Sequence, residues 1–248
     1  IIDVRHMLDV ITAIGGTVER SGQRVSIHVA QVNTSEISRE LCNKVRTSIL
    51  CVAPLLHRTG KAKLHPPGGD VIGRRRLDTH FYGLQKLGAT VDSNGSYAFN
   101  VPTRLRGAEM FFDEPSVTGT EHIMMAAAVS EGHTLIRNAA CEPHVQDLAV
   151  MLNAMGAKIT GMGTNQLTIE GVPSLHGTTH QVCHDHIEAA SYLALAAATG
   201  GEIKVEGTDL HSYWMCHRVF ETLGVKIELY KDHIWLPGNQ ELRITRDN

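Results

Sequence analysis

The chain has 248 residues, of which 42% are hydrophobic, and a formal net charge of −3. This length is enough for one or two domains with sizeable cores, and the near-neutral charge gives no reason to expect nucleic acid or an anionic membrane as a partner. The sequence has no run of about 18 apolar residues, and its first residues lack the basic and apolar regions of a signal peptide. We therefore expect neither a membrane span nor secretion.

The cysteines and histidines are numerous but predict no metal site. Five cysteines are scattered along the chain, which fits reduced thiols in a cytoplasmic protein better than a disulfide framework. The segment 183–186 reads Cys-His-Asp-His, but adjacent residues of an extended segment point to alternating faces, so the four side chains cannot reach one ion. We expect neither a metal nor a cofactor.

One pattern recurs along the chain: an apolar helix, a corner of small residues, and a two-stranded ribbon. The corners are centred on Gly15, Gly88, Gly156 and Gly224, at intervals of 73, 68 and 68 residues. Each glycine follows an apolar helical pattern, where a helix C-terminus favours a left-handed residue. Turns such as Asn94-Gly95 divide the β-type segments that follow. A sustained period of this kind predicts duplicated structural units.

A second helix, rich in small residues, is predicted between successive corners. These helices are expected at about 35–59, 119–130 and 187–199, and each is followed by glycine and a short strand. They are apolar on nearly every side, so they should be buried. Thr118 to Glu121 resembles a capping box at the start of one of them. The sequence thus predicts an α/β protein of about three βαβαββ units, preceded by the back half of another, with the helices inside.

The loop at 66–78 carries the most distinctive chemistry. It contains two prolines, three glycines, the carboxylate of Asp70 and three consecutive arginines at 74–76. A helical pattern begins at Leu77, so the loop can present a helix N-terminus to an anion. Composition alone leaves two alternatives open, a solvated basic turn and an anion-binding loop.

Together, the repeat and several short motifs resemble the enolpyruvyl transferases over essentially the whole chain. The most specific stretches are Arg46-Thr47-Ser48-Ile49, Pro67 to Arg75, Leu77-Asp78-Thr79-His80, Ser116 to Glu121 and Glu142-Pro143. The resemblance implies inside-out α/β barrels, each built from three such units around buried helices. It also implies a first domain over residues 1–183 and one repeat unit of a second domain over residues 184–248.

The resemblance implies transfer of the enolpyruvyl group of phosphoenolpyruvate to the 3-hydroxyl of UDP-N-acetylglucosamine, which releases phosphate and begins peptidoglycan synthesis. Such a reaction needs a proton for the methylene carbon and fixed cations for phosphate and carboxylate oxygens. By position, Asp70 matches the family's proton donor and Arg75 matches the loop arginine on the substrate anions. Arg46 matches the arginine that contacts the nucleotide sugar.

Further residues match the family's nucleotide contacts. The segment that lines the uridine site corresponds to Arg75, Arg76, Leu77, Asp78 and Thr79, and a second contact corresponds to Ser116 and Val117. Structural alternatives remain open for three of the matched residues: Arg46 as a plain surface arginine, Asp78 as a helix cap, and Ser116 as a helix start without a ligand. We expect His80 to be packed or hydrogen-bonded rather than catalytic, and Glu142 to precede a helix.

Chains of this family are longer, with about six units. The resemblance places this sequence after a lysine–asparagine pair that contacts phosphoenolpyruvate and before an aspartate proposed to take the sugar hydroxyl proton, so we expect these residues alone to lack full activity. Two alternatives are a transferase that acts on shikimate 3-phosphate and a non-catalytic relative that binds UDP-sugars or a partner. The residues at 68–70 and 77–80 favour UDP-N-acetylglucosamine over shikimate 3-phosphate. The sequence gives no signal for an oligomeric state.

Overall fold

A computed structural model of the chain describes residues 1–69, 76–207 and 212–243. Contacts between Cα atoms divide it into two compact units, unit 1 at 1–180 and unit 2 at 181–248. The predicted boundary lay three residues later, and the correspondence of the units with the family's domains remains a prediction. Within the described ranges, no helix is long and apolar enough to cross a membrane.

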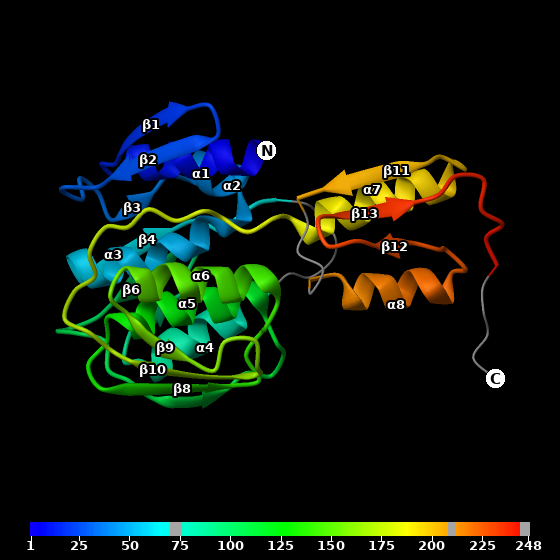
Figure 1. Ribbon diagram of the computed structural model, residues 1–248. Helices are drawn as coiled ribbons and strands as arrows, with labels where there is room; N and C mark the ends of the chain where they lie inside the picture. Colours follow the sequence, from blue (N-terminus) through cyan, green and yellow to red (C-terminus); the bar gives the residue numbers. More distant parts are fainter. Residues whose placement is uncertain (70–75, 208–211, 244–248) are drawn as a thin grey trace. The chain divides into compact units, whose positions relative to one another are not determined.

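Unit 1 begins with the back half of a repeat and continues with two complete repeats (Figure 1). The elements of the back half are α1 (Ile2–Ala13), β1 (Thr17–Ser21) and β2 (Arg24–His28). Those of the first complete repeat are β3 (Glu36–Ile37), α2 (Arg39–Lys44), the 3-10 helix η1 (Arg46–Cys51), α3 (Val52–Thr59), β4 (Lys61–Leu64), α4 (Asp78–Lys86), β5 (Thr90–Asp92) and β6 (Tyr97–Asn100). Those of the second are β7 (Glu109–Phe111), α5 (Val117–Ala128), β8 (His133–Arg137), α6 (Pro143–Ala154), β9 (Lys158–Thr160) and β10 (Gln166–Glu170).

The two complete repeats have the same sheet topology. Their strand orders are β3-β4-β6-β5 and β7-β8-β10-β9. In each sheet the first two strands are parallel and the remaining pairs are antiparallel. The βαβαββ order predicted from the sequence is therefore confirmed for both repeats.

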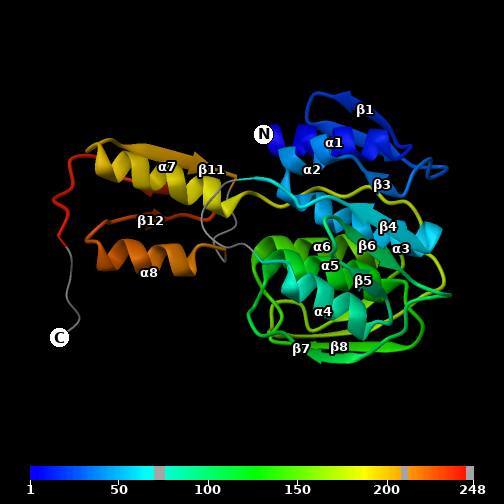
Figure 2. The same cartoon turned by 180° about the vertical axis from the view of Figure 1, so that it is seen from behind.

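The core of unit 1 is built around α5, which packs against α3, α4 and α6. Figures 1 and 2 show these helices between the sheets, which lie on the outside of the unit. Small side chains at Ala126, Ala127 and Ala128 allow the close approach of neighbouring helices, and all three are fully buried. The expectation of buried, small-residue helices is confirmed for α5, but it is wrong for the helix predicted at 187–199, which leaves Ile187, Tyr192 and Leu195 exposed.

Unit 2 has the elements of one repeat without a described first strand. They are α7 (His186–Ala198), β11 (Ile203–Glu206), α8 (Trp214–Thr222), β12 (Glu228–Leu229) and β13 (His233–Leu236). The strand order β11-β13-β12 matches the last three strands of the other sheets. Asp185 caps α7, since its Oδ1 accepts hydrogen bonds from the backbone N–H groups of Ile187 and Glu188, both at 3.0 Å.

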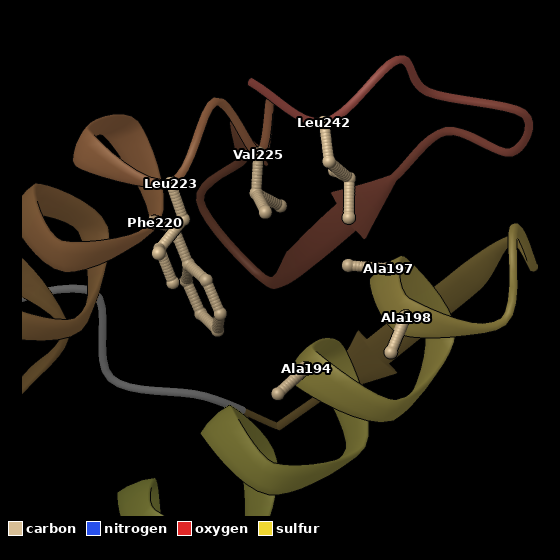
Figure 3. Close-up of a pocket in the computed structure, with 7 residues that line it drawn as sticks. All are labelled: Ala194, Ala197, Ala198, Phe220, Leu223, Val225 and Leu242. Atoms are coloured by element: carbon tan, nitrogen blue, oxygen red, sulfur yellow. The ribbon is translucent and has the colours of Figure 1, made fainter. Parts of the chain in front are cut away.

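A pocket of about 260 Å³ lies between α7 and α8 (Figure 3). Its lining is wholly apolar and consists of Ala194, Ala197, Ala198, Phe220, Leu223, Val225 and Leu242. Phosphate and carboxylate groups need cations or hydrogen-bond donors, which these side chains cannot provide. This pocket is therefore not a candidate for the anionic substrates that the sequence predicts.

The helix corners follow the prediction, but one predicted helix and one predicted capping box do not. Gly15, Gly88, Gly156 and Gly224 have φ angles of 113°, 95°, 99° and 74°, as left-handed corner residues should. The single helix predicted at 35–59 is wrong, because Val45 is extended (φ −151°, ψ 129°) and divides it into α2, η1 and α3. The predicted capping box is also wrong, as described with the site below.

Changing Gly171 to alanine is expected to destabilise unit 1 by about 3 kcal/mol, because overpacking against backbone cannot relax cheaply. A Cβ at this position would lie 1.9 Å from the carbonyl oxygen of Ser130 at the end of α5. Gly177→Ala is the matched control, since nothing lies within 4 Å of its Cβ position. It should change stability by no more than about 0.5 kcal/mol.

Urea unfolding followed by far-UV circular dichroism measures this difference. Trp214 and Trp235, the two tryptophans of the chain, both belong to unit 2, so their fluorescence provides a separate signal for that unit. Equal stability of the two alanine variants would contradict the packing argument.

Candidate functional site

The first residues of η1, α4 and α5 meet at one end of the unit 1 helix bundle. Arg46 begins η1, and its Nη2 donates to the carbonyl oxygen of Arg76, 3.0 Å away, just before α4. Thr79 in the first turn of α4 packs against the first turn of α5, because its Cγ2 lies 2.8 Å from the position of a Cβ on Gly119. Helix N-termini expose backbone N–H groups and favour anions. The arrangement is therefore suited to phosphate or carboxylate groups.

Arg46 also lies beside the residues that flank segment 70–75. Gly68 sits on the end of α2, where a Cβ would be 1.9 Å from the carbonyl oxygen of Asn43. At Gly69 a Cβ would be 3.4 Å from the Cβ of Arg46, and Arg76 accepts the Arg46 hydrogen bond on the other side. The half-buried Arg46 thus contacts both flanks of the segment. Asp70 and Arg75, two of the predicted site residues, lie outside the described residues.

The residues that follow this segment divide into exposed and buried ones. Arg76 and Asp78 form an ion pair, with side chains 74% and 61% exposed. Leu77 is only 7% exposed and packs in the core, so it can contact a ligand only through its backbone. Asp78 is the first residue of α4 and makes no side-chain capping hydrogen bond. Its alternative role as the N-cap is therefore wrong, because Leu77 occupies that position.

Ser116 is the N-cap of α5, and its Oγ accepts a hydrogen bond of 3.2 Å from the backbone N–H of Gly119. The helix thus begins at Val117, two residues before the predicted start, and Thr118 lies inside its first turn. The capping role of Ser116 is confirmed, and a ligand contact by Ser116 or Val117 remains a prediction. Both residues are half-buried beside the first turn of α4.

A histidine pair lies directly behind this end of the bundle. The Nδ1 atoms of His80 on α4 and His122 on α5 are 3.0 Å apart, and both side chains are buried. The Nε2 of His80 lies 3.3 Å from the Thr118 hydroxyl. The expectation of a packed, hydrogen-bonded His80 is confirmed. His122 was missed, although a histidine followed by the apolar run 123–128 of a helix predicted to be buried signals a polar group that needs a partner.

Burial lowers the pKa of both histidines. The pKa of His80 falls to about 4, mainly by desolvation and secondarily through the positive charge of Arg46. The pKa of His122 is well below its usual range, again by desolvation first and then through His80. Both imidazoles are therefore neutral at pH 7.

The carboxyl group of Glu121 in α5 interacts electrostatically with that of Glu142 at the start of α6. Burial first, and the charge of Glu142 second, raise the pKa of Glu121 on α5 to about 7. Glu142 is the N-cap of α6, and its buried Oε2 has no hydrogen-bond partner among the described residues. This pair could not be predicted from the sequence, because the burial of Glu121 depends on how α6 packs against α5.

Glu121→Gln should stabilise the fold relative to the original chain as the pH rises. A carboxyl whose pKa is raised in the folded state opposes folding above its unfolded pKa of 4.5, and this penalty grows until the pH passes 7. The glutamine variant should therefore gain about 3 kcal/mol relative to the original chain between pH 4.5 and pH 8.

Urea unfolding at the two pH values measures this gain. Glu114→Gln, which removes an exposed carboxylate just before α5, is the control and should show no such gain. A pH-independent difference between Glu121→Gln and the original chain would mean that folding does not shift the pKa of Glu121.

A family model places the chain in a known class of proteins. The family described as EPSP synthase (3-phosphoshikimate 1-carboxyvinyltransferase) matches residues 1–245. The chain therefore belongs to this family of enolpyruvyl transferases, and the predicted membership is confirmed.

Among the relatives, those named UDP-N-acetylglucosamine 1-carboxyvinyltransferase are similar over 99% of the chain. The protein from Borrelia garinii subsp. bavariensis is 44% identical over 245 residues, and the chain covers 57% of it. The protein from Treponema denticola is 46% identical over 246 residues, with 58% covered. The chain thus spans little more than half the length of these relatives.

Solved structures share the fold. The enolpyruvyl transferase NikO from Streptomyces tendae has a TM-score of 0.80 at 19% identity, over 96% of this chain and 58% of that one. An EPSP synthase from Acinetobacter baumannii has a TM-score of 0.69, also at 19% identity, over 96% of this chain and 57% of the other. The predicted α/β fold of the enolpyruvyl transferases is confirmed by these likenesses.

Proposed function

We propose that the chain takes part in the transfer of the enolpyruvyl group of phosphoenolpyruvate to the 3-hydroxyl of UDP-N-acetylglucosamine, with release of phosphate. The observation that carries the proposal is the identity of 44–46% with transferases of that name over 99% of the chain. Likeness to an EPSP synthase structure is much weaker in sequence, at 19% identity. The nucleotide sugar is therefore favoured as the acceptor over shikimate 3-phosphate.

The end of the helix bundle supports this proposal through the groups that it gathers. Arg46 is assigned to the nucleotide sugar, because an arginine fork binds anionic oxygens bidentately and stays charged. The backbone of Arg76 and Leu77, with the side chains of Asp78 and Thr79, is assigned to the uridine. Ser116 and Val117 provide the second nucleotide contact at the start of α5.

Asp70 is assigned as the donor of the proton to the methylene carbon of phosphoenolpyruvate, because it matches the proton donor of the family's loop. Arg75 is assigned as a contact of the substrate anions, because it matches the loop arginine. An aspartic acid must be protonated to donate, and neighbouring arginines favour its charged form. Bound phosphoenolpyruvate neutralises those arginines and disfavours a further negative charge. We therefore expect Asp70 to acquire its proton only in the substrate-loaded site.

The proposed activity is that of a complete transferase, to which this chain contributes Arg46, the loop and the helix N-termini. Such a reaction begins the synthesis of peptidoglycan, on which cell shape and division depend. The proposal includes a cytoplasmic location, because the five cysteines are all free thiols, as expected in a reducing compartment.

Phosphate release from phosphoenolpyruvate tests the proposal. UDP-N-acetylglucosamine and shikimate 3-phosphate are offered separately to the 248-residue chain and to any longer natural form, and each ligand's binding is measured by calorimetry. Phosphate release with the nucleotide sugar alone supports the proposal, whereas release with shikimate 3-phosphate overturns the choice of acceptor. Binding of the nucleotide sugar without turnover in the longest natural form would indicate a non-catalytic binding protein.

A further inference from the structure

The buried histidine pair connects the interior of the bundle to the proposed ligand site. His122 is 0% exposed and His80 is 2% exposed, and their Nδ1 atoms are 3.0 Å apart. The other ring nitrogen of His80 meets Thr118 Oγ1 at 3.3 Å. The Nε2 of His122 is buried, and no hydrogen-bond partner for it occurs among the described residues. The contacts thus form a chain from His122 through His80 to Thr118.

Only one of the two Nδ1 atoms can carry the shared proton. The surroundings of the other nitrogen of each ring decide which one does. If His80 held it, His122 would carry its proton on Nε2 and bury an N–H donor without a partner. If His122 holds it, the unpartnered atom is an acceptor, and buried orphan acceptors are tolerated better than orphan N–H donors. The geometry therefore favours a proton on Nδ1 of His122 and a proton on Nε2 of His80.

This placement of the two imidazole protons determines whether the Thr118 hydroxyl donates or accepts. Its oxygen accepts from Nε2–H of His80, so its own proton is available to an outside acceptor. Within the described part of the chain, His80 is the only hydrogen-bond partner of this hydroxyl. Thr118 is half-buried in the first turn of α5, beside Ser116 and Val117 and directly across from α4.

We propose that His122 and His80 are positioning residues that hold the Thr118 hydroxyl as a hydrogen-bond donor to an acceptor oxygen of the nucleotide sugar. The ligand class rests on the proposed function, whereas the order of the protons rests on the contacts alone. Without the donor on His122, His80 is free to adopt the other tautomer. Thr118 then donates to His80 instead of the ligand.

The proton order is tested first without any ligand. Two-bond ¹H–¹⁵N correlation spectra distinguish the two neutral tautomers of an imidazole, and loss of signals in His122→Asn and His80→Gln assigns the two rings. The expected result is an Nδ1–H tautomer for His122 and an Nε2–H tautomer for His80. The reverse assignment would overturn the proposal, even in a chain that binds UDP-N-acetylglucosamine.

The donor role is tested by calorimetric titration of the folded 248-residue chain with UDP-N-acetylglucosamine. Thr118→Val removes the hydroxyl at nearly constant shape and should weaken binding about tenfold, whereas Thr118→Ser keeps the donor and should stay within about twofold. His122→Leu should also weaken binding about tenfold. His122→Asn should restore it, because the asparagine amide lies close to the place of Nδ1 and keeps a donor.

The double variant separates positioning from simple packing. Because both changes remove the same hydrogen bond, Thr118→Val with His122→Leu should bind about as weakly as either single variant, not about a hundredfold more weakly than the original chain. Additive losses, or equal losses in His122→Leu and His122→Asn, would show that His122 only fills space. Where His122→Leu fails to fold, His122→Asn and the two Thr118 variants still decide the outcome.

Failure of the proposed function looks different from failure of this inference. If the folded original chain does not bind UDP-N-acetylglucosamine at all, the proposed ligand and the donor role of Thr118 are both overturned, while the tautomer spectra still decide the proton order. If the original chain binds and Thr118→Val binds equally well, the proposed function stands and the donor role is overturned.

Discussion

Replacing Asp70 with asparagine is expected to abolish enolpyruvyl transfer, with a loss of about 10³-fold in turnover, because an amide cannot deliver the proton that general acid catalysis supplies. The nucleotide sugar should bind nearly as before, since its assigned contacts are Arg46 and the starts of α4 and α5. Phosphate release measures turnover and calorimetry measures binding, both in the longest natural form that is active.

Asp9→Asn is a matched control for this variant. Asp9 is an exposed carboxylate on α1, so its removal changes the net charge by the same amount without touching the loop. Turnover by Asp70→Asn close to that of Asp9→Asn would remove Asp70 from the donor role. Loss of nucleotide-sugar binding in Asp70→Asn would instead indicate that the loop controls substrate access.

Acid should destabilise unit 1 through the buried histidine pair. The folded pKa of His80 is lowered to about 4, and that of His122 is well below its usual range. The stability that depends on these neutral rings is present above the unfolded pKa of 6.5 and is lost as the pH falls below it, since only the unfolded chain gains both protons. From pH 7 to pH 4.5 the His80 ring alone should cost about 2.5 kcal/mol, and His122 should add to this loss.

Glu121 titrates in the opposite direction, so the measurement is made in the Glu121→Gln background. Urea unfolding at pH 7 and pH 4.5 gives the acid loss, and hydrogen exchange of peptides from unit 1 confirms where it occurs. Adding His122→Asn should reduce the loss, while His28→Asn, on exposed β2, should leave it unchanged. An undiminished loss in His122→Asn would show that other groups cause it.

The repeat made much of the fold predictable, because glycine corners and hairpin turns are local signals. The left-handed angle of Gly88 and the hairpin at Asn94-Gly95 depend on a few neighbouring residues, and both appear as expected. The break in the helix predicted at 35–59 depends on the extended backbone of Val45 and the six residues of 3-10 helix after it. Helix propensity alone could not locate that break, since Asn43, Val45 and Thr47 are only modestly unfavourable in a helix.

The candidate site also combines features that could be predicted from the sequence with features that could not. The sequence located Arg46, Asp78 and Ser116, which the fold brings to one end of the bundle from segments far apart in the chain. It could not reveal that Leu77 is buried or that His122 faces His80, because both facts depend on how α4 packs against α5. The ligand contacts assigned to these residues remain predictions, and their packed environment could not be predicted.

The position of β10 has a consequence for how the protein is made. This strand, at the end of unit 1, lies between β8 and β9 in its sheet, and the core around it extends back to Val10. At about 5–20 residues per second, roughly 10 to 30 seconds of translation separate Val10 from Ile169. Because α5 ends at Ala128, its apolar surface lacks its final cover on the ribosome-bound chain during the last part of that time, between Ala128 and Ile169. We therefore expect the nascent protein to depend on chaperones that shield such helices until the last strand emerges.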